Sequence, residues 1–517
     1  MARLKKAADT GAGVAGYGAS FGTGAQPPGE QERQGGPRTQ SEVRLRPVMP
    51  APGTRRRLPD AIAASPYAAD LSALCRAVRD AGGRALLVGG SVRDALLGVP
   101  PKDLDIEVYG IGADSLVNLL RARYRIDLVG KAFGVIKLHG LPIDIALPRR
   151  ESKAGTGHKG FEIRADPGLS PEEAALRRDF TVNAIAFDPL DELLIDPCGG
   201  VDDLAARVLR HTSEKFAEDP LRVLRGMQFA ARFDMAVASA TVALCRALEP
   251  EGLSVERVFD EWRKLILKGV RPSRGLAFLE ACGWIRHFPE LAALIGCAQE
   301  PDWHPEGDVW THTLHCMDAF AAGRVGDDWE DLVVGLAVLC HDFGKPATTL
   351  FERGRLRSAG HEAAGEAPTR AFLARLTAQG DLVDQVVSLV VCHLRPQMLY
   401  GARSGDSAIR RLARQTRIDR LVRVSRADAM GRPPTPFDGD PAGEWLLARA
   451  KALDVAEAAP KPLVMGRHLL ELGVPPGPPL GRILDACYEA QLNGAFATLE
   501  EGIAFAVKRL PKPHPLV

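Results

Sequence analysis

The sequence predicts a multidomain α+β protein in which a mixed sheet is followed by regions that are entirely helical. Three observations support this class. Short apolar runs bounded by glycine and proline, which are typical of strands, occur between residues 84 and 195. From residue 213 onward the apolar residues recur mainly at helical spacing. At 517 residues the chain is long enough for three or four domains, each with its own core.

Composition narrows the class of protein further. A hydrophobic content of 46% and a charged content of 25% are ordinary for a globular protein, and the net charge of +1 gives no global argument for nucleic-acid binding. The chain has no apolar run long enough to span a membrane. Its nine cysteines include no CxxC pair, which favours reduced thiols in a cytoplasmic protein over a zinc or disulfide framework.

Five regions are expected along the chain. Residues 1–60 are rich in glycine, proline and arginine, and we expect a disordered basic arm without assigned function. Four folded regions follow, at 61–212, 213–300, 301–436 and 437–517. The first contains the predicted sheet, and the other three are expected to be helical.

The sheet region is organised around a strand, a glycine turn and a helix. Arg84–Val88 reads as a buried strand, Gly89 and Gly90 form the turn, and Ser91 begins a helical pattern. Free backbone N–H groups and the positive end of the helix dipole then face one point. This arrangement suits a phosphate chain.

Two aspartates follow on the next strand. Asp103 and Asp105 stand two apart beside an apolar alternation, so a strand places both carboxylates on one face. Paired carboxylates beside a phosphate site predict a divalent cation, most simply Mg²⁺. Val135–Leu138 and Leu141–Ile145 read as strands joined at Gly140, where Asp144 is either a third carboxylate on that face or a solvated edge residue.

A glycine pair and two aspartates alone are equally compatible with a turn and surface acids. However, GGSVRDALLG followed by DLDIE resembles the signature of class II tRNA nucleotidyltransferases, the CCA-adding enzymes, and their poly(A) polymerase relatives in the polymerase-β-like superfamily. The resemblance implies a nucleotidyltransferase head at 61–212, with Asp103 and Asp105 as the catalytic metal ligands. It also implies that four residues hold the triphosphate: Gly89, Gly90, Ser91 and Arg93.

The second half of the head continues this resemblance. Residues 149–165 are polar and glycine-rich and predict a mobile loop, as in the resembling family. A helix is expected from Ser170, as N-cap, to about Asp179, with strands at 181–187 and 193–195. The run RRDFTVNAIAFDP resembles the second motif of the family, which implies contacts with ribose and phosphates. The residues given this role are Arg178, Asp179 and Asn183. A surface salt-bridge group is the simpler alternative.

A third motif opens the helical region at 213–300, which the resemblance makes a neck and body. Asp219 as N-cap and Pro220 begin a helix on which Asp219 and Arg222 share a face. The simpler interpretation is an isolated ion pair. A carboxylate and a guanidinium can also match the edges of cytosine and adenine, which is the role the resemblance implies. The residues concerned are Glu218, Asp219 and Arg222. The match continues through residues 223–233, in which Arg225 is also expected to bind the nucleotide.

Basic residues gather further along this region, on an amphipathic helix at 254–267 and just after it. They either follow an RNA backbone or form a solvated face. They are Arg257, Arg263, Lys264, Lys268, Arg271 and Arg274.

Residues 301–436 carry a second constellation. His312, the pair His341-Asp342 and the later Asp428 fall on three expected helices, and imidazoles and carboxylates in a bundle can hold one divalent ion. The ordered set resembles the HD phosphohydrolase superfamily, so this part is called the HD region. His361 and His393 are further candidate ligands. Such a ligand set favours a transition metal, namely Ni²⁺, Mn²⁺ or Co²⁺.

The C-terminal region at 437–517 is expected to be helical. A rigid turn is predicted at 473–481. We expect this region to pack against the others or to dock RNA.

Taken together, the motifs resemble most closely the bacterial multifunctional CCA proteins. The resemblance implies Mg²⁺-dependent addition of C, C and A to tRNA 3′ ends from CTP and ATP, without a nucleic-acid template. It also implies an HD phosphohydrolase activity on 2′,3′-cyclic phosphates, 2′-nucleotides or phosphomonoesters. The partners expected are tRNA, CTP and ATP, with no membrane, and the sequence leaves monomer and homodimer open.

Three alternatives stay open. The nearest is a poly(A) polymerase or an enzyme that adds only CC or only the terminal A, since all share the head motifs. An HD hydrolase with an inactive head conflicts with the complete head motif set. A non-catalytic tRNA-binding protein conflicts with the retained pair Asp103 and Asp105.

Overall fold

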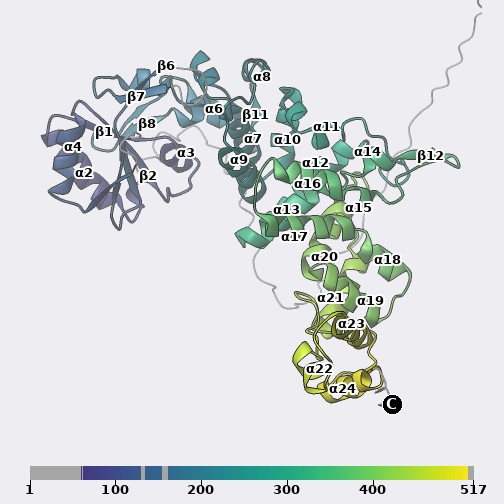
Figure 1. Ribbon diagram of the computed structural model, residues 1–517. Coiled ribbons are helices and arrows are strands. Elements are labelled where there is room, and N and C mark those ends of the chain that lie inside the picture. Colours follow the sequence, from purple (N-terminus) through teal and green to yellow (C-terminus); the bar gives the residue numbers. More distant parts are fainter. Residues whose placement is uncertain (1–59, 61, 130–133, 154–160, 511–517) are drawn as a thin grey trace, which may run out of the picture. The chain divides into compact units, whose positions relative to one another are not determined.

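The computed structural model describes residues 60, 62–129, 134–153 and 161–510 (Figure 1). The basic arm predicted for residues 1–60 lies almost entirely outside these residues. None of the helices described is long and apolar enough to cross a membrane. All nine cysteines are free thiols, in agreement with the prediction.

The N-terminal region folds around a seven-stranded mixed sheet, as predicted. The strand order is β3-β4-β5-β2-β1-β8-β9, in which β2 and β5 are parallel and every other neighbouring pair is antiparallel. The strands are β1 (Arg84–Val88), β2 (Leu104–Tyr109), β3 (Ile126–Val129), β4 (Val135–Leu138), β5 (Ile143–Ala146), β8 (Ala186–Asp188) and β9 (Leu193–Ile195). Each strand predicted between residues 84 and 146 is present.

The alternation of β2 decides which face of the sheet carries its acids. Leu104 and Ile106 belong to the core cluster that includes the buried side chains of α2 (Ala68–Asp80) and α4 (Ala113–Arg121). Figure 1 shows these two helices together on one side of the strands. Because side chains alternate along a strand, Asp105 lies on the opposite face.

The prediction of a mobile loop at 149–165 is wrong at both ends of that segment. Its flanks form an antiparallel hairpin of β6 (Arg149–Lys153) and β7 (Phe161–Ala165), and residues 154–160 between them lie outside the described part. Backbone pairing stabilises these strands without any burial alternation in the sequence. The polar composition of the segment therefore gave no strand signal.

The strand predicted at 181–187 is also shorter than expected. Residues Thr181–Asn183 form a 3₁₀ turn, and β8 begins only at Ala186. The Thr181 hydroxyl donates to Asp203 Oδ2 at 2.7 Å, which holds the chain in the turn. The preceding helix, α5 (Pro171–Ala175), has the predicted Ser170 cap but ends before Arg178.

The neck and body are helical, with one small exception. The last helix of the head is α6 (Gly200–Ala206), and the helices of the neck and body are α7 (Leu221–Phe233), α8 (Ser239–Arg246), α9 (Val255–Lys268), α10 (Pro272–Ala281) and α11 (Pro289–Ala292). The exception is a parallel two-residue pairing of β10 (Val208–Leu209) with β11 (Ala236–Val237). Gly275 lets α10 approach α7 closely, since a Cβ there would lie 2.3 Å from the Met227 carbonyl oxygen.

The HD region is a helical bundle interrupted by one hairpin, so the prediction of an entirely helical region is wrong at that point. Its helices are α12 (Val309–Ala322), α13 (Asp328–Cys340), α14 (Lys345–Thr348), α15 (His361–Ala364), α16 (Glu366–Ala374), α17 (Gly380–Cys392), α18 (Arg395–Gly401), α19 (Asp406–Gln415) and α20 (Ile418–Met430). The hairpin pairs β12 (Leu350–Glu352) with β13 (Arg355–Arg357). Its turn residues Arg353 and Gly354 have φ values of +50° and +79°, which a two-residue hairpin of type I′ requires.

The C-terminal helices are α21 (Pro441–Ala452), α22 (Gly466–Glu471), α23 (Pro478–Leu492) and α24 (Leu499–Val507). The predicted boundary at 437 precedes α21, whose buried Leu446 belongs to the large core, whereas a separate small core begins at Val464. The turn predicted at 473–481 is shorter than expected, because α23 already begins at Pro478.

Candidate functional sites

The glycine turn after β1 lies between a cation and a carboxylate. Gly89 has φ +69°, a conformation that favours glycine, and it precedes α3 (Gly90–Leu96). A Cβ at Gly89 would lie 3.0 Å from Arg178 Nη1 and 3.9 Å from Asp105 Oδ2. Any other residue here would occupy the space between these two charged groups.

Ser91 connects the glycine turn to the start of strand β2 by hydrogen bonds. Its buried hydroxyl donates to the Asp103 carbonyl oxygen at 3.0 Å and accepts from the Asp105 N–H at 3.1 Å. These contacts give the hydroxyl a positioning role, and its contact with the triphosphate, which the resemblance implies, stays a prediction. It fixes the backbone that carries both aspartates.

Three carboxylates gather on the open face of the sheet. Asp103 and Asp105 are exposed, and Asp144 stands beside Asp105 in the parallel register of β2 and β5. Loss of hydration raises the pKa of Asp105, Arg178 opposes this shift, and the charges of Asp144 and Asp103 add to it. Lys137 Nζ lies 2.9 Å from Asp144 Oδ2. Clustered carboxylate oxygens of this kind fit a hard divalent cation.

Asp179 is the centre of a buried polar network. Its Oδ2 accepts from Arg225 Nε at 2.7 Å, and its Oδ1 accepts from Asn183 Nδ2 at 3.0 Å and from the Phe180 N–H at 2.8 Å. Burial alone would raise the pKa of Asp179, but Arg225 and these hydrogen bonds hold it below its ordinary value. Both carboxylate oxygens therefore already have protein partners.

The network continues to Arg93. The Arg93 Nη1 donates to Asn183 Oδ1 at 2.5 Å, and its Nη2 lies 2.7 Å from Asp94 Oδ1. The guanidinium carbon also lies 4.3 Å from the centroid of the Phe233 ring. These contacts fix the orientation of a buried cation beside the glycine turn.

One cavity of about 310 Å³ brings most of the predicted head residues together. We call it the head pocket. Its predicted wall residues are Gly89, Gly90, Arg93, Asp105, Arg178, Asp179, Asn183 and Arg225. It is also lined by Gln228, Phe229, Arg232, Lys264 and Lys268, of which only the two lysines were singled out in the sequence, and as contacts to RNA. Six cationic side chains face two carboxylates there, a balance that suits a polyphosphate.

The additional cations have an identifiable signal. Phe229 and Arg232 follow Arg225 at spacings of four and seven on α7, so all three share one helix face. Partial burial, followed by the charges of Arg232 and Lys264, lowers the pKa of Lys268. Mutual repulsion of this kind is relieved when an anion binds between the cations.

The predicted base-reading residues have other partners in this structure. Asp219 Oδ2 pairs with Arg257 Nη2 at 2.8 Å, and its Oδ1 accepts from the Leu221 N–H at 3.1 Å. The prediction of Asp219 as N-cap is wrong by one residue, because Pro220 occupies that position and Asp219 has an extended backbone. Arg222 donates to the backbone carbonyl oxygens of Lys215 and Arg177 at 2.8 and 2.7 Å.

Glu218 lies 3.5 Å from Arg177 Nη2. Ser91, Asp103, Glu218, Asp219 and Arg222 are not among the residues that line the head pocket.

The remaining basic residues near α9 and α10 are largely paired with acids. Arg263 pairs with Asp328, while Arg271 and Arg274 both approach Asp234. Exposed pairs of this kind contribute little to stability. At these three arginines the ion pairs fit a solvated charged surface, which was one of the two interpretations left open by the sequence.

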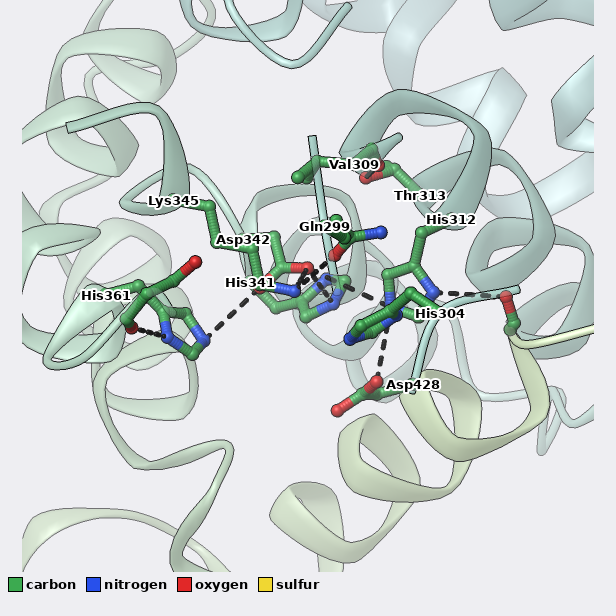
Figure 2. A network of polar contacts seen from close by, with 12 residues as sticks. Gln299, His304, Val309, His312, Thr313, His341, Asp342, Lys345, His361 and Asp428 are labelled. Atoms are coloured by element: carbon green, nitrogen blue, oxygen red, sulfur yellow. Dashed lines mark hydrogen bonds and ion pairs between the residues drawn. The ribbon is translucent and has the colours of Figure 1, made fainter. Parts of the chain in front are cut away.

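The HD region brings all six of its predicted residues into one buried group, and Figure 2 labels five of them: His312, His341, Asp342, His361 and Asp428. We call the whole group the histidine cluster. It comprises His304, Glu306, His312, Cys316, His341, Asp342, His361, His393 and Asp428. Asp342 lies at its centre, with Oδ2 3.2 Å from His341 Nε2 and Oδ1 3.3 Å from His361 Nε2.

Three of the histidines share one hydrogen-bonding pattern. Each donates from Nδ1 to the carbonyl oxygen three residues earlier, at 2.8 Å for His341, 2.7 Å for His361 and 2.7 Å for His393. A carbonyl can only accept, so Nδ1 carries the proton and the Nε2 lone pair is left for a ligand. His361 Nε2 and His393 Nε2 lie 3.2 Å apart.

His312 completes the other side of the cluster. Its Nε2 lies 3.2 Å from Asp428 Oδ1 and 3.3 Å from Cys316 Sγ. Arg432 Nη2 pairs with the same Asp428 oxygen at 2.7 Å. In Figure 2, His312 and Asp428 lie on one side of Asp342 and His361 on the other.

Glu306 was missed in the sequence. Its buried Oε1 lies 2.7 Å from His312 Nδ1 and 2.8 Å from His304 Nδ1. Burial would raise the pKa of Glu306, but hydrogen bonds from His304 and His312 hold it at about 2. A carboxylate three residues after Trp303 carries no local signal for this contact, which depends on the loop that leads into α12.

The centre of the histidine cluster contains unsatisfied groups. Among the described residues, His341 Nε2 and both oxygens of Asp342 have no hydrogen-bond partner of good geometry, although Lys345 Nζ lies 2.8 Å from Asp342 Oδ2. Two candidate ligand groups adjoin at this point, one with His312, Cys316, His341 and Asp428 and one with Asp342, His361 and His393. Buried lone pairs of this kind fit divalent cations.

Comparison with known proteins identifies close relatives. Residues 85–210 match the family of the poly A polymerase head domain. The multifunctional CCA protein of Laribacter hongkongensis is 38% identical over 388 residues, which cover 72% of this chain and 90% of the relative. The multifunctional CCA protein of Chromobacterium violaceum is 40% identical over 380 residues, covering 71% and 89%.

Solved structures share the fold. The Bacillus stearothermophilus CCA-adding enzyme in complex with CTP aligns with a TM-score of 0.59 at 23% identity, covering 86% of this chain and 98% of that one. The Thermotoga maritima CCA-adding enzyme complexed with tRNA aligns with a TM-score of 0.54 at 20% identity, covering 88% and 99%. At these identities the likeness concerns the fold alone.

Proposed function

Since the chain belongs to the family of bacterial multifunctional CCA proteins, we infer that it is a nucleotidyltransferase that adds C, C and A to tRNA 3′ ends from CTP and ATP. In this reaction the 3′-hydroxyl oxygen bonds to the α-phosphorus of the nucleotide. The bond from that phosphorus to the bridging oxygen breaks, pyrophosphate leaves with the electron pair, and the hydroxyl proton is released. The protein's contribution is mainly positioning and charge stabilisation.

The head pocket is the observation that carries this proposal. It combines the Gly89–Gly90 turn with the Asp105 carboxylate and a wall of six cations. The cations suit the triphosphate and the departing pyrophosphate, whose charge increases as the bond breaks. We assign Arg178, Lys264 and Lys268 to phosphate contacts because they line the pocket beside the turn.

We propose that Asp103 and Asp105, with Asp144 beside them, hold Mg²⁺. The raised pKa of Asp105 and the close carboxylates support a hard cation there. Bound at this place, Mg²⁺ would polarise the phosphoryl oxygens and favour the attacking alkoxide. Ser91 keeps the two aspartates in place through their backbone groups.

Asp179 and Asn183 act in this proposal as positioning residues. They hold Arg225 and Arg93 in fixed orientations on the pocket wall, while contacts with ribose fall to groups with free hydrogen-bonding capacity, such as Gln228. The buried Gln228 Oε1 has no hydrogen-bond partner among the described residues. Base selection by Glu218, Asp219 and Arg222 stays a proposal, and it requires Arg222 to exchange its backbone partners.

We also propose a phosphohydrolase activity for the histidine cluster, on 2′,3′-cyclic phosphates, 2′-nucleotides or phosphomonoesters. The elements of water are added across a phosphorus–oxygen bond, which breaks to leave a hydroxyl and a phosphate product. The Nε2 lone pairs of the histidines and the unsatisfied Asp342 support binding of Ni²⁺, Mn²⁺ or Co²⁺. Such a cation would polarise the phosphate and lower the pKa of water.

Within that site the protein groups have separate tasks. Lys345 Nζ lies 2.8 Å from Asp342 Oδ2, so it can compensate charge on the carboxylate or on a phosphate. Glu306 fixes the orientation of His312. The partners proposed are tRNA, CTP and ATP in the cytoplasm, either as a monomer or as a homodimer.

A tRNA lacking its 3′ CCA tests the proposed function. It would be incubated with CTP alone, ATP alone and both together, and the products resolved at single-nucleotide length. CCA addition predicts two residues with CTP and three with both. A long A tract would identify a poly(A) polymerase, arrest after CC would identify a CC-adding enzyme, and addition of A only to a tRNA that already ends in CC would identify an A-adding enzyme.

A further inference from the structure

Two exposed aromatic side chains lie beside the histidine cluster. Phe351 is 73% exposed and Trp303 is 65% exposed, the highest values for large apolar side chains among the described residues. Exposed aliphatic residues are common on protein surfaces. Two exposed aromatic rings near one polar cluster offer flat faces on which nucleic-acid bases can stack.

Phe351 belongs to the β12–β13 hairpin, whose two ends meet the cluster. The hairpin begins five residues after Lys345 and ends four residues before His361. At its base, Thr349 Oγ1 lies 2.7 Å from Ser358 Oγ, and the Ser358 carbonyl accepts from His361 Nδ1. Figure 1 shows the hairpin extending beside α14. It therefore rises from the edge of the proposed hydrolase site.

Trp303 lies on a segment that is tied to the same hairpin. The Leu356 N–H donates to Glu300 Oε2 at 2.9 Å, and Arg355 Nη2 lies 3.5 Å from Asp302 Oδ2. These contacts hold the residues on either side of position 301 against β13.

Exposure within the cluster increases toward these aromatic residues. The side chains of His341 and Asp342 are 1% and 2% exposed, whereas those of His361 and His304 are 10% and 13% exposed. His304 directly follows Trp303, and His361 follows the hairpin. The two more exposed histidines of the cluster are therefore the ones that adjoin Trp303 and the hairpin in the chain.

The hairpin also carries unpaired positive charge. The side chains of Arg353 and Arg357 are exposed and have no ion-pair or hydrogen-bond partner among the described residues. Arg353 occupies a turn position with φ +50°, where asparagine, aspartate or glycine is usually found. A cation therefore stands at the tip of the hairpin despite an unfavourable backbone conformation.

We propose that Trp303, Phe351, Arg353 and Arg357 form an aromatic rim that binds the single-stranded 3′ end of an RNA chain and presents its terminal phosphate to the histidine cluster. Bases stack on the two rings, and the arginines contact the backbone phosphates. The substrate of the site is then an RNA end rather than a free nucleotide. This inference rests on the proposed phosphohydrolase activity.

Kinetics with two substrates test the rim. The kcat/KM would be measured for 2′,3′-cyclic AMP and for a hexanucleotide RNA ending in a 2′,3′-cyclic phosphate. We expect the double variant Trp303→Ala, Phe351→Ala to lose at least about tenfold on the RNA, since the loss of one stacked base corresponds to roughly five- to 150-fold. Hydrolysis of cyclic AMP should stay within about twofold. Val325→Ala, at a residue of similar exposure, is the control.

Binding gives a second readout that needs no hydrolysis. Anisotropy of a labelled hexanucleotide would be followed against salt with excess tRNA present, and Arg353→Ala, Arg357→Ala should reduce the slope of log K by about 0.7 for each phosphate that is no longer neutralised. Rim-dependent binding without hydrolysis of either substrate would support the rim and refute the phosphohydrolase. The rim proposal would be overturned if the protein hydrolysed cyclic AMP while wild type and variants bound and cleaved RNA equally well.

Discussion

Substitution of Asp179 by alanine should disable the head pocket without touching the proposed metal ligands. Asp179 is the shared acceptor for Arg225 and Asn183, and Asn183 in turn orients Arg93. In the variant Arg225 loses its carboxylate partner, and Arg93 keeps Asp94 but loses the support of a fixed Asn183. We therefore expect a loss of nucleotide addition together with a loss of stability.

The expected loss of stability follows from how deeply the ion pair between Asp179 and Arg225 is buried. Removing one partner of a buried ion pair costs about 3–5 kcal/mol. The Asp179 side chain is 8% exposed but that of Arg225 is 34% exposed, so water can solvate the remaining cation and the lower end, about 3 kcal/mol, applies. A shift of about 1 Å in a positioning group can cost roughly a hundredfold in rate.

Stability should also depend on pH through Asp179. Its pKa in the folded protein lies below the ordinary value of 3.8, so the unfolded chain binds the proton more readily. The contribution of Asp179 to stability is complete above about pH 4 and is lost as the pH falls through the lower folded value. Asp179→Ala should therefore remove part of the stability difference between neutral and acidic pH.

A matched control separates activity from folding. Asp203 is also a buried acid of the head, paired with Arg210 and hydrogen-bonded to Thr181, but it does not line the head pocket. Urea unfolding and kcat/KM for CTP addition would be measured for Asp179→Ala and Asp203→Ala. Both should lose stability and only the first should lose kcat/KM in the folded state. A folded Asp179→Ala protein within about threefold of wild type would refute the reasoning.

Three other substitutions give separate predictions. Arg222→Ala should raise incorporation of UTP and GTP relative to CTP and ATP, whereas an equal decline with all four nucleotides would make Arg222 a structural partner of Lys215. Asp342→Asn should abolish metal-dependent hydrolysis of cyclic phosphate and leave CCA addition unchanged, and loss of CCA addition in the folded variant would contradict separate sites. Glu306→Gln should weaken Mn²⁺ or Ni²⁺ binding by about 10- to 100-fold in calorimetry because His312 loses its carboxylate acceptor, and unchanged affinity would show that Glu306 does not act through His312.

The sequence predicts the features that depend on local patterns. The strand at Arg84–Val88, the glycine turn and the Ser170 cap follow from alternation, backbone freedom and capping, and the structure contains all three. The order of His341, Asp342 and the other HD residues predicted a group that the fold does bring together.

Other features depend on contacts that no local pattern encodes. The predicted helix face shared by Asp219 and Arg222 is wrong, because α7 begins only at Leu221 and the Asp219 carboxylate pairs with Arg257 from another helix. Glu306 reaches His312 only because the preceding loop folds back onto α12. The hairpins at 149–165 and 350–357 form through backbone pairing, and the second also through positive-φ turn residues, which hydrophobic periodicity does not report.

The most direct test of the central claim is extension of a tRNA lacking CCA by the wild type, Asp105→Ala and Asp114→Ala under identical conditions with CTP, ATP and Mg²⁺. Asp114 is an exposed acid of the first turn of α4 and serves as the control. We expect three nucleotides to be added by the wild type and the control, and a loss of more than about a hundredfold in rate, roughly 2.7 kcal/mol, for Asp105→Ala. A folded Asp105→Ala protein within about tenfold of the wild type, or a wild-type product other than CCA, would contradict the account.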